Sequence, residues 1–407
     1  MKKETLLGYV STRVLDTPFW GLYNLMPFIL YKDLNGTPFQ VALLIMLKPM
    51  VSLLSMYWAS HVHGRPDRLI KNILWGRILG YFPFFLVPWI HSSWYFIAIY
   101  GTFMLFTVGI VPAWMELLKK NLPDKTREKT FAYTQAFGYM GGGLFPFLIG
   151  GLLDGYTDAW RWLFPVAALI GFSAVLFQSR MRIEKGGEEL TPEIKGFQKV
   201  KHPWIQSWKL LKEQVDFRRF QIGFTFVGAG LMVIQPALPV FFVDTLNLSY
   251  TELAVAVTLC KGIGFAVGTP GWTHLLGRLG IFLFSGGIAA LAALFPFILL
   301  SARYEMWLLW VAYFIYGFAQ AGSELAWNMS GPIFSGKKES SLYSSINVVM
   351  VGLRGAVVPT LGSMLIYMTS SSATMAIGGG LCLIGGLSLS YFANRSDGIP
   401  LAADKTV

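Results

Sequence analysis

Charge and cysteine are both scarce in this sequence. Charged residues make up 14% of its 407 residues, hydrophobic residues make up 54%, and the two cysteines are Cys260 and Cys382. A soluble domain carries about 25% charged residues, so this composition excludes a disordered, collagen-like or nucleic-acid-binding chain. Both cysteines lie in apolar runs, which excludes a disulfide framework and the ligand spacing of a zinc site.

Long polar stretches are also missing. The net charge of +11 would favour a nucleic-acid partner only if it were gathered on a water-facing domain, and no stretch is long and polar enough to form one. The sequence likewise contains no nucleophile–base set, phosphate loop or cluster of metal ligands. We therefore expect no enzyme activity, no cofactor, no metal site and no nucleic-acid partner.

What the sequence has instead is a series of long apolar runs. A helix that crosses a membrane needs about 20 mostly apolar residues. Twelve segments meet this requirement, at 9–31, 38–60, 70–90, 94–118, 130–153, 160–180, 218–243, 250–272, 279–301, 305–331, 341–367 and 372–393. The sequence therefore predicts an all-α membrane protein with twelve transmembrane helices.

The distribution of Lys and Arg predicts the orientation of these helices. With a cytoplasmic N-terminus, 27 of the 33 basic residues fall in inside segments and 3 in outside segments. We therefore expect a multi-pass protein of the cell (inner) membrane with both termini in the cytoplasm. In the long connection 181–217, Trp204, Trp208, Leu211 and Val215 recur at helical spacing. This pattern fits either an amphipathic helix on the inner leaflet or a solvated linker.

An internal repeat is the strongest signal in the chain. A shift of 213 residues aligns many uncommon residues without a gap: Lys48 with Lys261, His61 with His274, Trp94 with Trp307, Trp114 with Trp327, Gly142 with Gly355 and Pro146 with Pro359. The repeat predicts two pseudo-symmetric six-helix bundles, 1–180 and 218–407, joined by the cytoplasmic linker 181–217. Parallel repeats of this kind are typical of transporters whose substrate site lies between the halves.

Several motifs strengthen this interpretation. Asp67, Arg68 and Lys71 match part of a Gly-x-x-x-Asp-Arg-x-Gly-Arg/Lys signature between the second and third helices, and Trp160-Arg161-Trp162-Leu163-Phe164 opens the sixth. In these features the chain resembles the major facilitator superfamily (MFS). The resemblance implies the MFS fold, transport by alternating access, and a gating loop at Asp67, Arg68 and Lys71. The glycine-rich fifth helix is similar to that of drug/proton antiporters, but the fourth helix lacks their buried Arg.

Four charged residues lie at mid-depth in the predicted helices: Lys48, Lys261, Arg354 and Glu324. Such residues face a water-filled path far more often than lipid. Since three of the four are basic, we expect the path to favour an anionic solute. The lysines could instead be deprotonated by burial or extend their ammonium groups to water, in which case they would not bind the solute. Glu324 is either a static partner that joins two helices or a proton carrier. In the first helix, Arg13 and Asp16 are expected to neutralise each other.

Other side chains complete the predicted cavity. Gln320 and Asn328 lie on the same helix as Glu324, and each either binds a polar solute or joins two helices. Trp114 and Trp327, which the repeat pairs, are expected to form aromatic walls of the cavity or to anchor the helices at the membrane interface.

The sequence thus predicts a monomeric secondary active transporter that moves a small polar, anionic solute across the lipid bilayer. The alternatives are a proton-coupled exporter of amphipathic compounds, with protons carried by Glu324, and a non-transporting membrane receptor or enzyme that keeps the fold.

Overall fold

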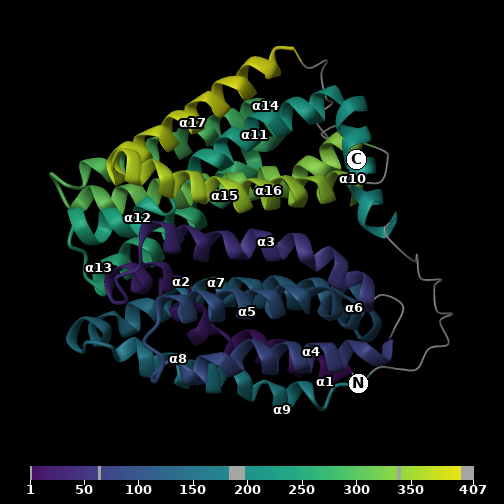
Figure 1. Ribbon diagram of the computed structural model, residues 1–407. Coiled ribbons are helices and arrows are strands. Elements are labelled where there is room, and N and C mark those ends of the chain that lie inside the picture. The colour runs from purple at the N-terminus through teal and green to yellow at the C-terminus, as the bar shows by residue number, and fades with distance from the viewer. Residues whose placement is uncertain (1, 63–65, 183–197, 337–340, 396–407) are drawn as a thin grey trace. The chain divides into compact units, whose positions relative to one another are not determined.

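The computed structural model describes residues 2–62, 66–182, 198–336 and 341–395 (Figure 1). Within these ranges the secondary structure is helical, with short turns and no strand. The chain divides into two compact units. The first comprises Met1–Glu193 with Ser249–Ala254, and the second comprises Ile194–Leu248 with Val255–Val407.

Long helices lie alongside one another in the first unit, with the amino-terminal helices in purple in Figure 1. They are α1 (Lys2–Leu15), α2 (Thr17–Lys32), α3 (Pro38–Val62), α4 (Pro66–Tyr81), the 3₁₀ turn η1 (Phe82–Leu86), α5 (Ser93–Gly109), α6 (Val111–Asn121), α7 (Asp124–Gly155), α8 (Ala159–Ser173), α9 (Val175–Gln178) and the short α13 (Tyr250–Ala254).

Several predicted helices of the first unit are broken. The segment 9–31 was expected to be one helix, but α1 ends at Leu15 and α2 begins at Thr17, with Pro18 in its first turn. Pro112 stands in the same way in the first turn of α6, within the expected helix 94–118. Proline lacks an N–H and disfavours a helical conformation in the preceding residue, so it starts a helix better than it continues one.

A buried ion pair joins three helices of the first unit. Arg77 of α4 donates from both terminal nitrogens to the Asp16 carboxylate at 2.6–2.9 Å, and Tyr81 donates to the same carboxylate at 2.6 Å. Arg77 also donates to the Gly171 carbonyl of α8 at 3.0 Å and is only 4% exposed. Asp16 was expected to be neutralised by Arg13. The structure shows that its hydrogen-bonded ion pair is with Arg77, while Arg13 adds a weaker electrostatic attraction without direct contact.

An aromatic cluster surrounds this pair. Phe19 is fully buried, and its ring centroid lies 4.6–4.7 Å from those of Tyr81, Phe84 and Phe103. Because Tyr81 belongs both to the cluster and to the ion pair, the apolar packing and the polar contacts fix the same helices. Burial of such rings contributes more than their area alone suggests, since edge-to-face contacts add about 0.5–1.5 kcal/mol each.

The segment Ser249–Ala254 is held in the first unit by two carboxylates. Asp154 accepts hydrogen bonds from the backbone N–H groups of Tyr250 and Thr251 and from the Thr251 hydroxyl, at 2.6–2.9 Å. The Tyr250 hydroxyl donates to Asp33 at 2.5 Å. Burial raises the pKa of the Asp33 carboxyl, against the opposing effects of this hydrogen bond and of Lys32. Gly150 allows this approach, since a Cβ there would lie 2.9 Å from the Thr251 Cα.

The second unit contains α10 (Gln198–Glu213), α11 (Val215–Val233), α12 (Ala237–Val240), the π-helical turns η2 (Phe241–Thr245) and η3 (Val255–Cys260), α14 (Lys261–Ser301), α15 (Trp307–Ser335), α16 (Ser341–Met368) and α17 (Ser371–Ala393). The linker prediction 181–217 thus includes a helix, α10. Its Leu210 and Leu211 pack against a core cluster of this unit, whereas Trp208 is exposed. The Trp204 side chain lies outside the described part.

The expected turn between 272 and 279 is absent from α14. The helix runs from Lys261 to Ser301 and departs from helical geometry at Gly280, with φ 69°. Only glycine adopts this conformation without steric cost. A single residue therefore separates the two helices that the sequence placed at 250–272 and 279–301.

Glycine also sets the distance between α11 and α17. A Cβ on Gly230 would lie 2.4 Å from the Gly378 carbonyl oxygen, and one on Gly385 would lie 2.8 Å from that of Gly223. Small residues let membrane helices pack backbone to backbone. These contacts hold α11, which supplies one wall of the cavity described below.

Six helical segments of the described part are long and apolar enough to cross a membrane. They are Ser93–Asn121, Ala159–Gln178, Val215–Thr245, Tyr250–Ser301, Ile346–Met368 and Ser371–Ala393. Tyr250–Ser301 covers two of the predicted helices and is 52 residues long.

The Asp16–Arg77 pair generates the first prediction. Asp16→Asn should lower the free energy of unfolding by about 3–5 kcal/mol, because it leaves a buried guanidinium without its counter-charge. Chemical denaturation in detergent micelles measures this loss. Lys209→Gln is the control, since Lys209 and its partner Glu213 are exposed and such pairs contribute about 0.3–0.5 kcal/mol. Equal effects of the two substitutions would show that the buried pair does not stabilise the unit.

Candidate functional site

A cavity of about 350 Å³ lies inside the second unit. Its walls come from four helices and the residue Gln235. They are formed by Phe224, Val227, Gly228, Leu231 and Met232 of α11, Ile288 and Ala292 of α14, Tyr316, Ala319, Gln320, Ser323, Glu324 and Trp327 of α15, and Val351 and Arg354 of α16. Four of the predicted site residues therefore meet here: Arg354, Glu324, Gln320 and Trp327.

Arg354 is placed by close contact with α11. One terminal nitrogen donates to the Phe224 carbonyl at 3.0 Å, and the guanidinium carbon lies 5.7 Å from the Phe224 ring centroid. A Cβ on Gly228 would lie 2.1 Å from the guanidinium carbon, so only glycine leaves room for this position. Within the part of the chain that the structure describes, Arg354 forms no ion pair, and its buried Nε has no hydrogen-bond partner.

Glu324 and Gln320 form the acidic side of the cavity. They are one turn apart on α15, and the Gln320 amide nitrogen donates to the Glu324 carboxylate at 3.1 Å. Among the residues that the structure describes, the buried Gln320 side-chain oxygen has no hydrogen-bond partner, and neither has the Trp327 indole nitrogen. Buried polar atoms without partners are rare and costly. The cavity therefore offers a polar solute unpaired donors from Arg354 and Trp327 and an unpaired acceptor from Gln320.

The two lysines are arranged differently. Lys261, at the start of α14, has its Nζ 4.9 Å from the ring centroid of Tyr316, which lines the cavity. The helix just before it is π-helical from Val255 to Cys260, and such local widening is frequent at functional sites. Lys48 lies exposed on α3 in the first unit. The proposed pairing of these two lysines at a substrate stays a prediction.

The remaining predicted site residues lie elsewhere. Trp114 is 5% exposed and packs edge to face on Tyr9, with ring centroids 5.3 Å apart, in the apolar core of the first unit. Asn328 is exposed, and its amide donates to the Glu324 backbone carbonyl at 2.8 Å instead of lining the cavity. In the expected gating loop, Arg68 and Lys71 lie in the first two turns of α4, and the Asp67 side chain lies outside the described part.

Sequence reasoning missed Tyr316, Phe224 and Gly228. Tyr316 precedes Gln320 and Glu324 at intervals of four residues, so a helical stripe of polar side chains could have included it. Nothing in the sequence distinguishes Gly228 from the many other glycines of the chain. Its role follows only from the approach of Arg354, which belongs to a helix more than a hundred residues later.

The structure consists of two helical units whose longest apolar helices could cross a membrane, and comparison with known proteins gives the family. A family model described as Major Facilitator Superfamily matches residues 11–332. The chain therefore belongs to the major facilitator superfamily, which confirms the resemblance drawn from its motifs and repeat. No curated protein sequence matches the chain.

Solved structures share the fold at low identity. A peptide transporter POT in complex with sulfate is 15% identical, with a TM-score of 0.71 over 97% of this chain and 94% of that one. A variant of the nucleoside transporter NupG is 13% identical, with a TM-score of 0.73 over 95% and 99%. A POT family transporter in complex with 5-aminolevulinic acid is 13% identical, with a TM-score of 0.69 over 97% and 96%.

The buried position of Trp114 generates the second prediction. Trp114→Ala should lower the free energy of unfolding by about 3–5 kcal/mol, because it empties a packed core position. Asn328→Ala, at an exposed position on α15, should change it by less than about 0.5 kcal/mol. Chemical denaturation in micelles measures both. If Trp114→Ala left stability unchanged, Trp114 would not be a core residue.

Proposed function

We propose that the protein is a secondary active transporter that moves a small polar, anionic solute by alternating access. The single observation that carries this proposal is Arg354, a positive charge that faces a cavity and forms no ion pair among the described residues. A guanidinium binds carboxylates and phosphates well because its planar donors match their oxygens.

The proposal includes the wider architecture. We infer twelve membrane crossings in two six-helix bundles, with both termini in the cytoplasm and the molecule in the inner membrane as a monomer. The 213-residue repeat and the excess of basic residues on one side support this arrangement. Asp67, Arg68 and Lys71 would then form a cytoplasmic gating loop, and Lys48 and Lys261 would supply further positive charge to the solute path.

Glu324 supports a role for protons as the coupling ion. It lines the same cavity as Arg354 and accepts a hydrogen bond from Gln320. A carboxylate that gains and loses a proton beside the substrate changes the net charge of the cavity by one unit during the cycle. The same residue would serve the alternative function, a proton-coupled exporter of amphipathic compounds.

Uptake into proteoliposomes tests the proposal. Organic anions, lipophilic cations and neutral solutes would be offered with and without a pH gradient. We expect uptake of organic anions and its loss in the Arg354→Gln variant. Removing a charged hydrogen-bond partner costs about 1.5–3 kcal/mol, which corresponds to binding weaker by about 10- to 100-fold. Uptake of lipophilic cations alone would instead indicate the exporter.

Gly228 generates a sharper prediction. Gly228→Ala keeps every charge but fills the space that the Arg354 guanidinium occupies, so anion binding should weaken by at least about tenfold. Gly271→Ala, on α14 with nothing within 4 Å of the added Cβ, is the matched control and should bind normally. Isothermal titration on purified protein compares the two. Equal affinities for both variants would show that anion binding does not require this position of the Arg354 guanidinium.

The role of Glu324 is tested by charge removal. Glu324→Gln should abolish uptake driven by a pH gradient while solute exchange between the two sides continues, because exchange needs no net proton movement. Glu305→Gln, at an exposed position before α15, should leave both activities unchanged. If gradient-driven uptake survives in Glu324→Gln, another group carries the proton, and if both activities fall with stability, Glu324 is a structural partner.

A further inference from the structure

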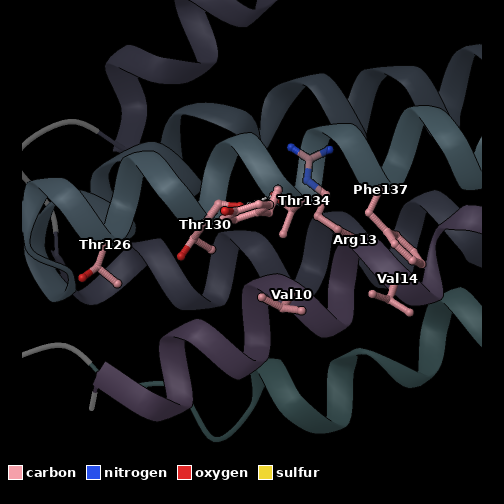
Figure 2. Close-up of a pocket in the computed structure, with 8 residues that line it drawn as sticks. Val10, Arg13, Val14, Thr126, Thr130, Thr134 and Phe137 are labelled. Carbon is pink, nitrogen blue, oxygen red and sulfur yellow. Dashed lines mark hydrogen bonds between the residues drawn. The ribbon is translucent and has the colours of Figure 1, made fainter. Parts of the chain in front are cut away.

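A second cavity lies in the first unit, between α1 and α7 (Figure 2). Its volume is about 490 Å³. The lining residues are Val10, Arg13 and Val14 of α1 and Thr126, Thr130, Tyr133, Thr134 and Phe137 of α7. Arg13 is the one basic residue among them, and Figure 2 shows it together with the threonines along the cavity.

Arg13 attracts the Asp16 carboxylate electrostatically, but its one side-chain hydrogen bond among the described residues is to a neutral group. Asp16, three residues later, is occupied by Arg77 and Tyr81. Arg13 itself donates to the Tyr9 hydroxyl at 3.2 Å, and its guanidinium carbon lies 5.3 Å from the Tyr9 ring centroid. It forms no ion pair with any residue that the structure describes. Because a guanidinium carries five N–H donors, most of its capacity is left for a ligand.

The facing wall of α7 carries hydroxyl groups. Thr126, Thr130, Tyr133 and Thr134 are spaced so that they share one face of the helix. The Thr134 hydroxyl donates to the Thr130 carbonyl at 2.8 Å, so the hydroxyls of Thr126, Thr130 and Tyr133 are the better placed donors. A guanidinium opposite hydroxyl donors is suited to an oxyanion, while Val10, Val14 and Phe137 would contact an apolar part of the same ligand.

The repeat relates the helices that line the two cavities, although it does not align the two arginines. In the 213-residue register, α1 and α2 correspond to α11 and α12, and α7 corresponds to α16. The Arg13 cavity therefore lies between the helices that are equivalent to α11 and α16, which line the Arg354 cavity. Each unit thus has one arginine in a cavity that this pair of helices helps to line. Arg13 comes from α1, the first helix of its pair, and Arg354 comes from α16, the second helix of the equivalent pair.

We propose that the first-unit cavity binds an oxyanion, a phosphate or carboxylate group, through the Arg13 guanidinium and the Thr130 hydroxyl. The group belongs either to a soluble organic anion or to the headgroup of an anionic lipid. The proposal concerns the first unit alone and does not depend on transport.

Site-resolved chemical labelling tests the proposal on the whole protein. Phenylglyoxal modifies accessible guanidinium groups, and mass spectrometry reads the modification at Arg13 and at exposed Arg303. The protein would be labelled in neutral detergent with and without inorganic phosphate or succinate. It would also be labelled in nanodiscs of phosphatidylcholine alone and with added phosphatidylglycerol. Labelling at Arg13 should fall about tenfold at a ligand concentration about ten times its Kd, while labelling at Arg303 stays constant.

The labelling experiments in detergent and in nanodiscs distinguish the two sources of the oxyanion. Protection by phosphate or succinate in detergent identifies a soluble anion, and protection only by phosphatidylglycerol identifies a lipid headgroup. Thr130→Val keeps the shape of the side chain, and about tenfold more ligand should be needed for the same protection. Protection of Arg13 should persist in Arg354→Gln, which separates this site from the proposed transport site. If no phosphate, succinate or anionic lipid protects Arg13, the proposal is wrong.

Discussion

The cost of placing a guanidinium among apolar helices is the constraint on which this structure depends. A charged side chain at a membrane helix centre costs about 2.5–3.5 kcal/mol even by insertion scales. Arg77 meets that cost with the Asp16 carboxylate, the Tyr81 hydroxyl and a backbone carbonyl. Arg354 donates to one backbone carbonyl and otherwise lines a cavity. The first arrangement neutralises the guanidinium within the protein and holds helices together. Arg354 forms no ion pair among the described residues, although the Nε atoms of both arginines are buried without a hydrogen-bond partner there.

Backbone packing makes the second arrangement possible. The glycines between α11 and α17 bring the two helices into contact, and Gly228 on another face of α11 leaves the space that the Arg354 side chain occupies. Opposite Arg354, the α15 stripe of Tyr316, Gln320 and Glu324 supplies acceptors and an aromatic wall. The cavity is thus one small polar region enclosed by apolar residues, which is the general form of a small-molecule site.

Much of the scaffold could be predicted from sequence because apolar length and a repeat are properties of whole segments. The positions of helix breaks could be predicted less well: Pro18 and Pro112 begin new helices, and Gly280 replaces an expected turn. Arg354, Glu324 and Gln320 were found because polar residues are rare in the apolar segments, and Trp327 was found because the repeat pairs it with Trp114. The hydrogen-bonded partner of Asp16 was not predicted, since Arg13 is close in sequence while Arg77 is close only in space. The repeat register aligns whole helical segments but not the site residues, because it aligns Arg354 with Gly141 and Glu324 with Val111.

We propose above all that the Arg354 cavity binds the acidic group of the transported solute. The most direct measurement is a crystal structure of the protein with a brominated organic carboxylate chosen from the solutes that it takes up, with the bromine located by anomalous scattering. We predict a bromine peak within the cavity between α11, α15 and α16, with the carboxylate on the Arg354 guanidinium. A fully occupied ligand bound away from this cavity, with Arg354 still on the Phe224 carbonyl and the cavity unfilled, would contradict the account.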